Sequence, residues 1–177
     1  MQSASPDTEL QGREEPGELL REAATMVLYV SVVEIAELAA LPEDHFSGHT
    51  TGPVKTALLA ILWGTAIGLA IAHWFAFRLA APAFRGERLT SLDTKVGLAQ
   101  VGGAVFVAVV TSVPILLFSA QTGRDVAADL PAVIIGFVGY LVARRAGRGR
   151  IAAFFFGLTA LALGLLVAEV KNVLSGH

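Results

Sequence analysis

Five long apolar stretches, separated by short polar segments, constrain this chain more than any other feature of its sequence. Hydrocarbon admits only helices and closed barrels, because every backbone N–H and C=O must find a partner within the protein. The stretches lack the alternation of polar and apolar residues that barrel strands show, so they predict helices. Most of them are long enough to cross a bilayer. They cover residues 23–41, 56–82, 96–119, 130–143 and 151–170. The sequence therefore predicts an all-α integral membrane bundle of five transmembrane helices.

The fourth stretch is short for a membrane span, but it opens with Leu130-Pro131 directly after Asp129, which is a typical helix start. Pro16 likewise suits a first helical turn that runs on into the first stretch. We therefore expect residues 16–177 to form one transmembrane domain. The polar residues 1–15 predict a disordered acidic tail with no basic region of the kind that a signal peptide carries.

Composition agrees with a membrane protein and excludes several other classes. The chain is 54% hydrophobic, with a mean hydropathy of +0.65, and its net charge of −2 does not indicate nucleic-acid binding. It has no cysteine, which excludes thiolate metal sites and thiol catalysis. No phosphate loop, nucleophile elbow or zinc-protease motif is present, so we expect neither an enzyme nor a bound cofactor. Heavy use of Ala, Gly, Val, Leu and Arg is typical of high-GC bacteria.

The basic residues predict an orientation in the plasma membrane. Ten of the 13 Lys and Arg residues fall in the N-terminal tail and in the segments after the second and fourth stretches, when Arg78 at the end of the second stretch is counted with its segment. Short cytoplasmic segments carry an excess of Lys and Arg. Five helices then place the N-terminus inside and the C-terminus outside.

Small residues predict how the helices associate. In lipid, helices pack where small side chains let their backbones approach. The second stretch carries a row of small residues, including Gly64, Gly68 and Ala72, which faces either another helix of this chain or a second copy. Pro114 predicts a kink in the third stretch that frees a carbonyl near residue 110. Five helices make a thin wall around any path, so we expect a homo-oligomer.

Acidic residues within the apolar stretches are the strongest indication of function, because charges at bilayer depth are costly. Glu34 and Glu37 are three residues apart in the first stretch and share a helix face with Ser31. Other polar groups follow at several depths. They are His73, Gln100 and Glu169. Together these six residues form a predicted pathway for protons or small cations.

Two interpretations of the paired acids remain open. In the first, Glu34 and Glu37 line a wet path, and the protein is a channel or a simple transporter. In the second, Lys171 neutralises Glu37 and Glu34 is protonated in a dry bundle. The protein is then a membrane accessory or sensor subunit that assembles with a partner. His45 and His49 are four residues apart, but the Ser47-Gly48 pair between them favours a loop, so no metal site is predicted.

The chain resembles small multi-pass membrane proteins of high-GC bacteria in residues 70–75 (AIAHWF) and 170–174 (VKNVL). That resemblance covers most of the chain and implies no activity. Five helices with acids in the first are also similar in topology to vacuolar-iron-transporter-like proteins. This similarity is one of topology only and implies no site residues.

Overall fold

The computed structural model describes residues 6–41, 51–85 and 91–174, and within these ranges it contains helices and no strand. The predicted all-α class is confirmed for this part of the chain. The helices are α1 (Pro6–Ala39), α2 (Thr51–Arg85), α3 (Ser91–Leu117), α4 (Ala120–Arg145) and α5 (Arg150–Leu174).

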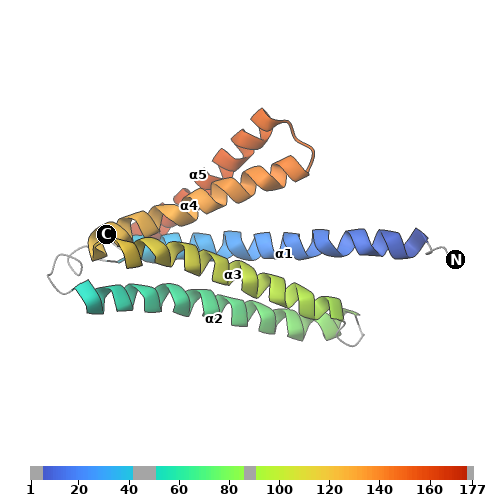
Figure 1. The fold of residues 1–177 in the computed structure, drawn as a ribbon, viewed down its shortest axis with the longest axis horizontal. Helices are drawn as coiled ribbons and strands as arrows, with labels where there is room; N and C mark the ends of the chain where they lie inside the picture. The colour runs from blue at the N-terminus through green and yellow to red at the C-terminus, as the bar shows by residue number, and fades with distance from the viewer. Residues whose placement is uncertain (1–5, 42–50, 86–90, 175–177) are drawn as a thin grey trace.

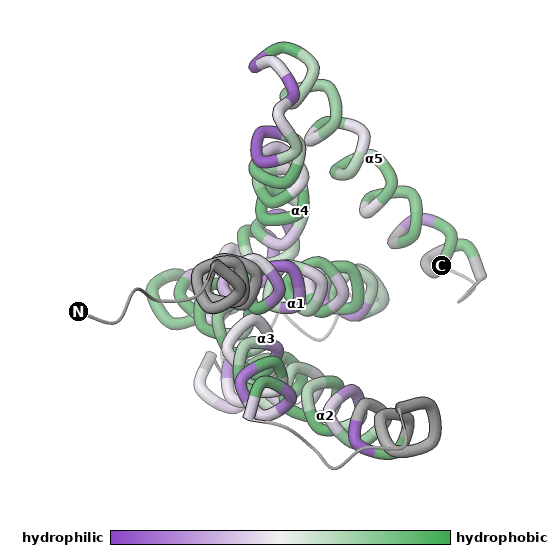
Figure 2. Tube along the Cα trace, turned by 90° about the vertical axis from the view of Figure 1, so that its right-hand side faces the viewer, coloured by the Kyte–Doolittle hydropathy of each residue, from purple (hydrophilic) through white to green (hydrophobic). Residues whose placement is uncertain are grey.

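Four of these helices, α2 to α5, are long and apolar enough to cross a membrane, which is the make-up of a multi-pass membrane protein. Figure 2 shows α5 as apolar along nearly its whole length. The helix α1 is not among the four, although it is 34 residues long. Acidic residues interrupt its apolar sequence.

The most polar of the five helices lies at the centre of the bundle. α1 runs through the middle and contacts each of the other four (Figure 1). α2 and α3 lie on one side of it, and α4 and α5 form a second pair on the other (Figures 1 and 2). Most side chains between Met26 and Leu38 are therefore covered by the neighbouring helices, although Tyr29 is 51% exposed.

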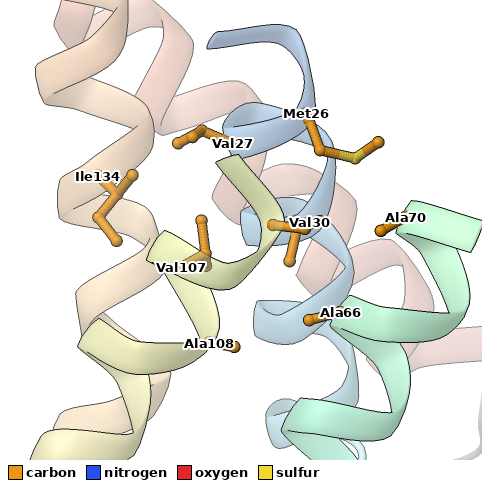
Figure 3. Packing of buried hydrophobic residues seen from close by; sticks show 9 residues of the cluster. Met26, Val27, Val30, Ala66, Ala70, Val107, Ala108 and Ile134 are labelled. Atoms are coloured by element: carbon orange, nitrogen blue, oxygen red, sulfur yellow. The ribbon is translucent and has the colours of Figure 1, made fainter. Parts of the chain in front are cut away.

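The largest apolar cluster forms where α1 meets α2, α3 and α4. The cluster includes Met26 and Val30 of α1, Ala66 of α2 and Val107 of α3, and all four side chains are buried (Figure 3). Small residues on α2 and α3 admit the larger side chains of α1, as close packing in a core requires.

The helix α4 begins earlier than predicted, at Ala120 and not at residue 130. Ser119 is its N-cap, and the Ser119 Oγ accepts a hydrogen bond from the Thr122 N–H at 3.3 Å. Pro131 therefore lies inside the helix, so the predicted helix start was wrong. Buried membrane helices tolerate an internal Pro because neighbouring groups satisfy the freed backbone.

The helix α1 also begins earlier than expected. It starts at Pro6, so residues 6–15, which the sequence placed in a disordered tail, are helical, and Pro16 lies within the helix. Residues 1–5 lie outside the described part of the chain.

The row of small residues on α2 does not pack against another helix of this chain. Gly64, Gly68 and Ala72 are exposed, and a Cβ added to either glycine would meet nothing within 4 Å. The alternative of packing within the chain is therefore wrong for these three residues. On α3, by contrast, Ala104 and Ala108 are fully buried in the core.

Pro114 is buried within α3, and the kink expected there stays a prediction. Its carbonyl oxygen lies 2.8 Å from the point where a Cβ on Gly123 would stand, so α3 and α4 approach closely there. The hydroxyls of Thr111 and Ser112 donate to the carbonyls of Val107 and Ala108, at 2.8 and 2.6 Å. They do not reach the carbonyl that Pro114 frees at residue 110.

Candidate functional site

Glu34 is the most deeply placed acidic residue that the structure describes. Its side chain is fully buried in the middle of the bundle, beside Ser31, which is also fully buried. Neither Glu34 oxygen accepts a hydrogen bond from any described residue, and the Ser31 hydroxyl likewise has no such partner. Burying a polar group without a hydrogen bond costs free energy, so Glu34 and Ser31 destabilise the bundle where apolar side chains would not.

Glu37 lies one helical turn further along α1 and has a different environment. Its side chain is half-buried, and the Thr65 hydroxyl of α2 lies 2.8 and 2.7 Å from its two oxygens. The hydroxyl donates its hydrogen to this carboxylate, which stabilises the charge. The predicted partner Lys171 has a side chain outside the described part of the structure, so that pairing stays a prediction.

The two acids form one cluster with residues of α2 and α3. The Thr111 side chain of α3 lies beside the Glu34 carboxyl, and Glu37 is close enough for the two carboxylates to interact electrostatically. Ser31, Glu34, Glu37, Thr65 and Thr111 are hereafter called the carboxylate cluster. The sequence predicted the three members on α1 because they share a helix face. It did not predict Thr65 and Thr111, which lie far from α1 in the sequence.

An arginine closes the end of α1 next to the cluster. The Arg124 guanidinium of α4 donates to the carbonyls of Leu38 and Leu41, at 3.2 and 2.9 Å. Carbonyls at a helix C-terminus lack partners within the helix and carry partial negative charge, so a cation is stabilising there. Arg124 lies between the predicted third and fourth stretches, among the three basic residues expected outside.

The other predicted pathway residues do not join this cluster. Gln100 is buried, and its amide donates to the Glu22 carboxylate at 2.9 Å, nearer the other end of α1. His73 is half-buried on α2, and Glu169 is exposed near the end of α5. In the described part of the chain, no hydrogen bond joins either of them to Glu34 or Glu37.

Apolar side chains separate the carboxylate cluster from the Glu22–Gln100 pair. Glu22 and Ser31 are about 13 Å apart along α1 at the usual helical rise. Met26 and Val30 occupy that interval, and both are buried in the apolar cluster that also contains Val107 of α3 (Figure 3). We call these three residues the apolar layer. The predicted run of polar groups from one end to the other is therefore interrupted within this chain.

His45 and His49, which were considered as metal ligands, lie outside the described residues. Among the residues that are described, no group of three His, Asp or Glu side chains is placed to hold a metal ion. The carboxylate cluster is thus a site built from two acids and three hydroxyls.

Comparison with known proteins gives no relative whose function could be assigned to this chain. No model of a protein family, no curated protein and no solved structure matches this chain.

Proposed function

We propose that this membrane protein passes protons or small cations, and that Glu34 is the group that carries the ion. The observation behind the proposal is the burial of the Glu34 carboxyl at the centre of the bundle without a hydrogen-bond donor. Moving a charged carboxylate to bilayer depth costs about 2.5–3.5 kcal/mol or more. A purely structural residue at this position gains nothing that offsets such a cost.

A buried carboxyl of this kind is stable in two states. It holds a proton and is neutral, or it lies beside a bound cation that compensates its charge. Passage of an ion requires a group that changes between such states. Ser31 and Thr111 supply hydroxyls that can coordinate a cation or donate to the ionised carboxylate.

The ion enters from the end of the bundle where α1 finishes. Glu37 is partly exposed there and shares the Thr65 hydroxyl, so it receives the ion before Glu34 does. On the other side of Glu34, Met26 and Val30 form the barrier that must open for passage. An apolar constriction that gates by its hydration is a known device in channels.

In this proposal α1 crosses the plasma membrane as the fifth span. Its position between the α2–α3 pair and the α4–α5 pair supports the assignment, because Glu34 then faces protein and not lipid. The split of basic residues supports an N-terminus inside and a C-terminus outside.

A homo-oligomer belongs to the same proposal. The exposed row at Gly64, Gly68 and Ala72 has no neighbour within the described chain, which leaves it open to a second copy.

Gly64→Leu should then reduce the oligomer without changing the fold of the protomer. Gly102→Leu is the matched control, because a Cβ there also meets nothing within 4 Å but lies on α3. Native mass spectrometry in several mild detergents measures both, and a wild type that is only monomeric contradicts this part.

Reconstitution into liposomes tests the transport proposal directly. Proton flux is followed with a pH-sensitive dye, and cation flux with a potential-sensitive dye under an ion gradient. Glu34→Gln keeps the shape of the side chain and removes its charge, so flux should fall to background. Glu37→Gln should reduce flux less, since its outer position is better solvated. Glu169→Gln is the matched control, because it removes an exposed acid far from the cluster.

A second function has its own supporting observation. The apolar layer at Met26 and Val30 interrupts the polar groups along α1, as expected for a bundle that conducts nothing. The protein would then be an accessory or sensor subunit of another membrane protein. Absence of flux in the wild type under every gradient, or full flux in Glu34→Gln, favours this second function over transport.

A further inference from the structure

The seam between α2 and α3 holds an apolar groove that the proposed function does not use. It has a volume of about 350 Å³, within the range of ligand sites. Its walls include Trp63, Ile67 and Ile71 of α2, and Leu98 and Val101 of α3. Ile71 and Leu98 are 60% and 67% exposed, so the groove opens sideways toward the surroundings of the bundle.

The groove has the length and direction of a lipid chain. From Trp63 to Arg78 it follows α2 for about 22 Å at the usual helical rise. One leaflet of the hydrocarbon core is about 15 Å thick, half of the total, so the groove is longer than the depth that one acyl chain must cover. Because α2 and α3 are both long and apolar enough to cross a membrane, an opening on their outer side faces acyl chains.

One end of the groove is positively charged. Arg78 lies two turns before the end of α2 at Arg85, and a long basic side chain near a helix end can reach the lipid headgroups. Its guanidinium stacks over the Trp74 ring at 4.7 Å from the ring centroid. Stacking occupies the flat face of the guanidinium and leaves its N–H groups, which lie in the plane, available for a phosphate. Among the described residues, none accepts a hydrogen bond from Arg78 in this structure.

A glycine on α3 makes this arrangement possible. A Cβ on Gly97 would stand 2.8 Å from the Trp74 Cδ1, so any larger residue would push the indole away. Thr94, one turn before Gly97, lines the groove at the same end as Arg78 and adds a hydroxyl donor. The backbone of α3 thus helps to hold the aromatic ring under the cation.

We propose that the α2–α3 groove binds one anionic phospholipid, with an acyl chain along Ile67, Ile71 and Val101 and its phosphate on Arg78. A net negative headgroup is favoured over a zwitterionic one because no choline offsets the charge that Arg78 meets. The inference requires only that α2 and α3 cross a bilayer, and it stands independently of ion passage.

Native mass spectrometry of the full chain tests the proposal. The protein is released from nanodiscs that contain equal amounts of phosphatidylglycerol and phosphatidylcholine, and the retained lipids are counted. The wild type should retain phosphatidylglycerol over phosphatidylcholine by about fivefold, the preference expected for one arginine near the headgroups. Arg78→Gln should bring that ratio close to one.

The matched control is Arg148→Gln. Arg148 also stacks on an aromatic ring, with its guanidinium 5.0 Å from the Phe156 centroid, but it lies at the α4–α5 turn away from the groove. This variant should keep the wild-type ratio. Val101→Trp fills the groove from a partly exposed position and should lower retention of both lipids.

Three results would overturn the proposal. The first is an unchanged lipid ratio in Arg78→Gln, and the second is wild-type lipid retention in Val101→Trp. The third is a wild-type dimer without bound lipid that Val101→Trp dissociates, because a second copy of the chain would then fill the groove. If Arg78→Gln fails to fold, Arg78→Lys replaces it. Lys keeps the charge but loses the planar stack, so its ratio should fall between those of the wild type and one.

Discussion

The interface between α4 and α5 and the interface between α1 and α3 are both close, but they hold different chemistry. Between α4 and α5, a Cβ on Gly157 would stand 2.6 Å from the Gly136 carbonyl oxygen, and one on Gly139 would stand 2.9 Å from Ala160 Cβ. No side-chain hydrogen bond crosses that interface among the described residues. Between α1 and α3, by contrast, a buried glutamate lies beside a buried threonine.

This difference separates stability from function within one bundle. Close contact of backbones at glycines gains dispersion energy with no desolvation of polar groups, so the α4–α5 pair is a purely structural joint. Burial of Glu34 between α1 and α3 costs free energy that packing elsewhere must offset. Changes in the two interfaces should therefore act in opposite directions.

Filling the glycine contact should have the largest effect. Gly157→Leu forces a side chain against the Gly136 carbonyl and the Tyr140 side chain, so α4 and α5 must separate. Overpacking alone costs about 1–3 kcal/mol, and separation of the pair should bring the loss to the top of that range or beyond. Thermal unfolding in detergent, followed by tryptophan fluorescence, measures the loss. Gly102→Leu should leave the melting temperature unchanged, and an equal loss in both variants would contradict the comparison.

Removing the buried acid should have the opposite sign. Glu34→Leu replaces an unsatisfied carboxyl with an apolar side chain of similar size, so the bundle should be more stable by about 1–3 kcal/mol. The same variant should abolish ion flux in liposomes. A lower melting temperature in Glu34→Leu would show that Glu34 has a stabilising partner, which fits the accessory-subunit function better.

Loss of the Thr65 hydroxyl should have the smallest effect of the three. Thr65→Val keeps the shape of the side chain but removes the donor at 2.7 Å from Glu37, a bond to a charged group worth about 1.5–3 kcal/mol when buried. Glu37 is only half-buried, so water can replace the lost hydrogen bond in part. The loss of unfolding free energy should therefore lie at or below the lower end of that range. The double variant Thr65→Val with Glu37→Gln should lose little more than Thr65→Val alone. Additive losses would mean that the two side chains do not interact.

Much of the fold was predictable because it depends on local sequence. Long apolar stretches predict helices wherever water is excluded, and the five stretches agree with the five helices. The start of α4 was mispredicted because Leu130-Pro131 is a typical helix start, while Ser119 was assigned to the end of the third apolar stretch. The structure selects Ser119, whose hydroxyl caps the helix.

The candidate site was predictable only in part. Glu34, Glu37 and Ser31 share one helix face, which spacing alone reveals. Thr65 and Arg124 reach the end of α1 from other helices, and nothing in their local sequence indicates that contact. The row at Gly64 and Gly68 has the spacing of a packing face, yet it is exposed, because spacing defines a face and does not say what covers it.

The sequence by itself determined that the chain is helical, that several helices are apolar enough for a membrane, and that α1 carries acids on one face. These properties follow from the period of the helix and from the cost of exposing backbone groups to hydrocarbon, which act within each segment. Only the tertiary structure decided that α1 lies at the centre, that Thr65 donates to Glu37 while Glu34 has no donor among the described residues, and that Met26 and Val30 seal one side of the cluster. Those outcomes depend on which helices come together. Their contacts join residues far apart in the chain, and packing selects among arrangements that each segment alone permits equally.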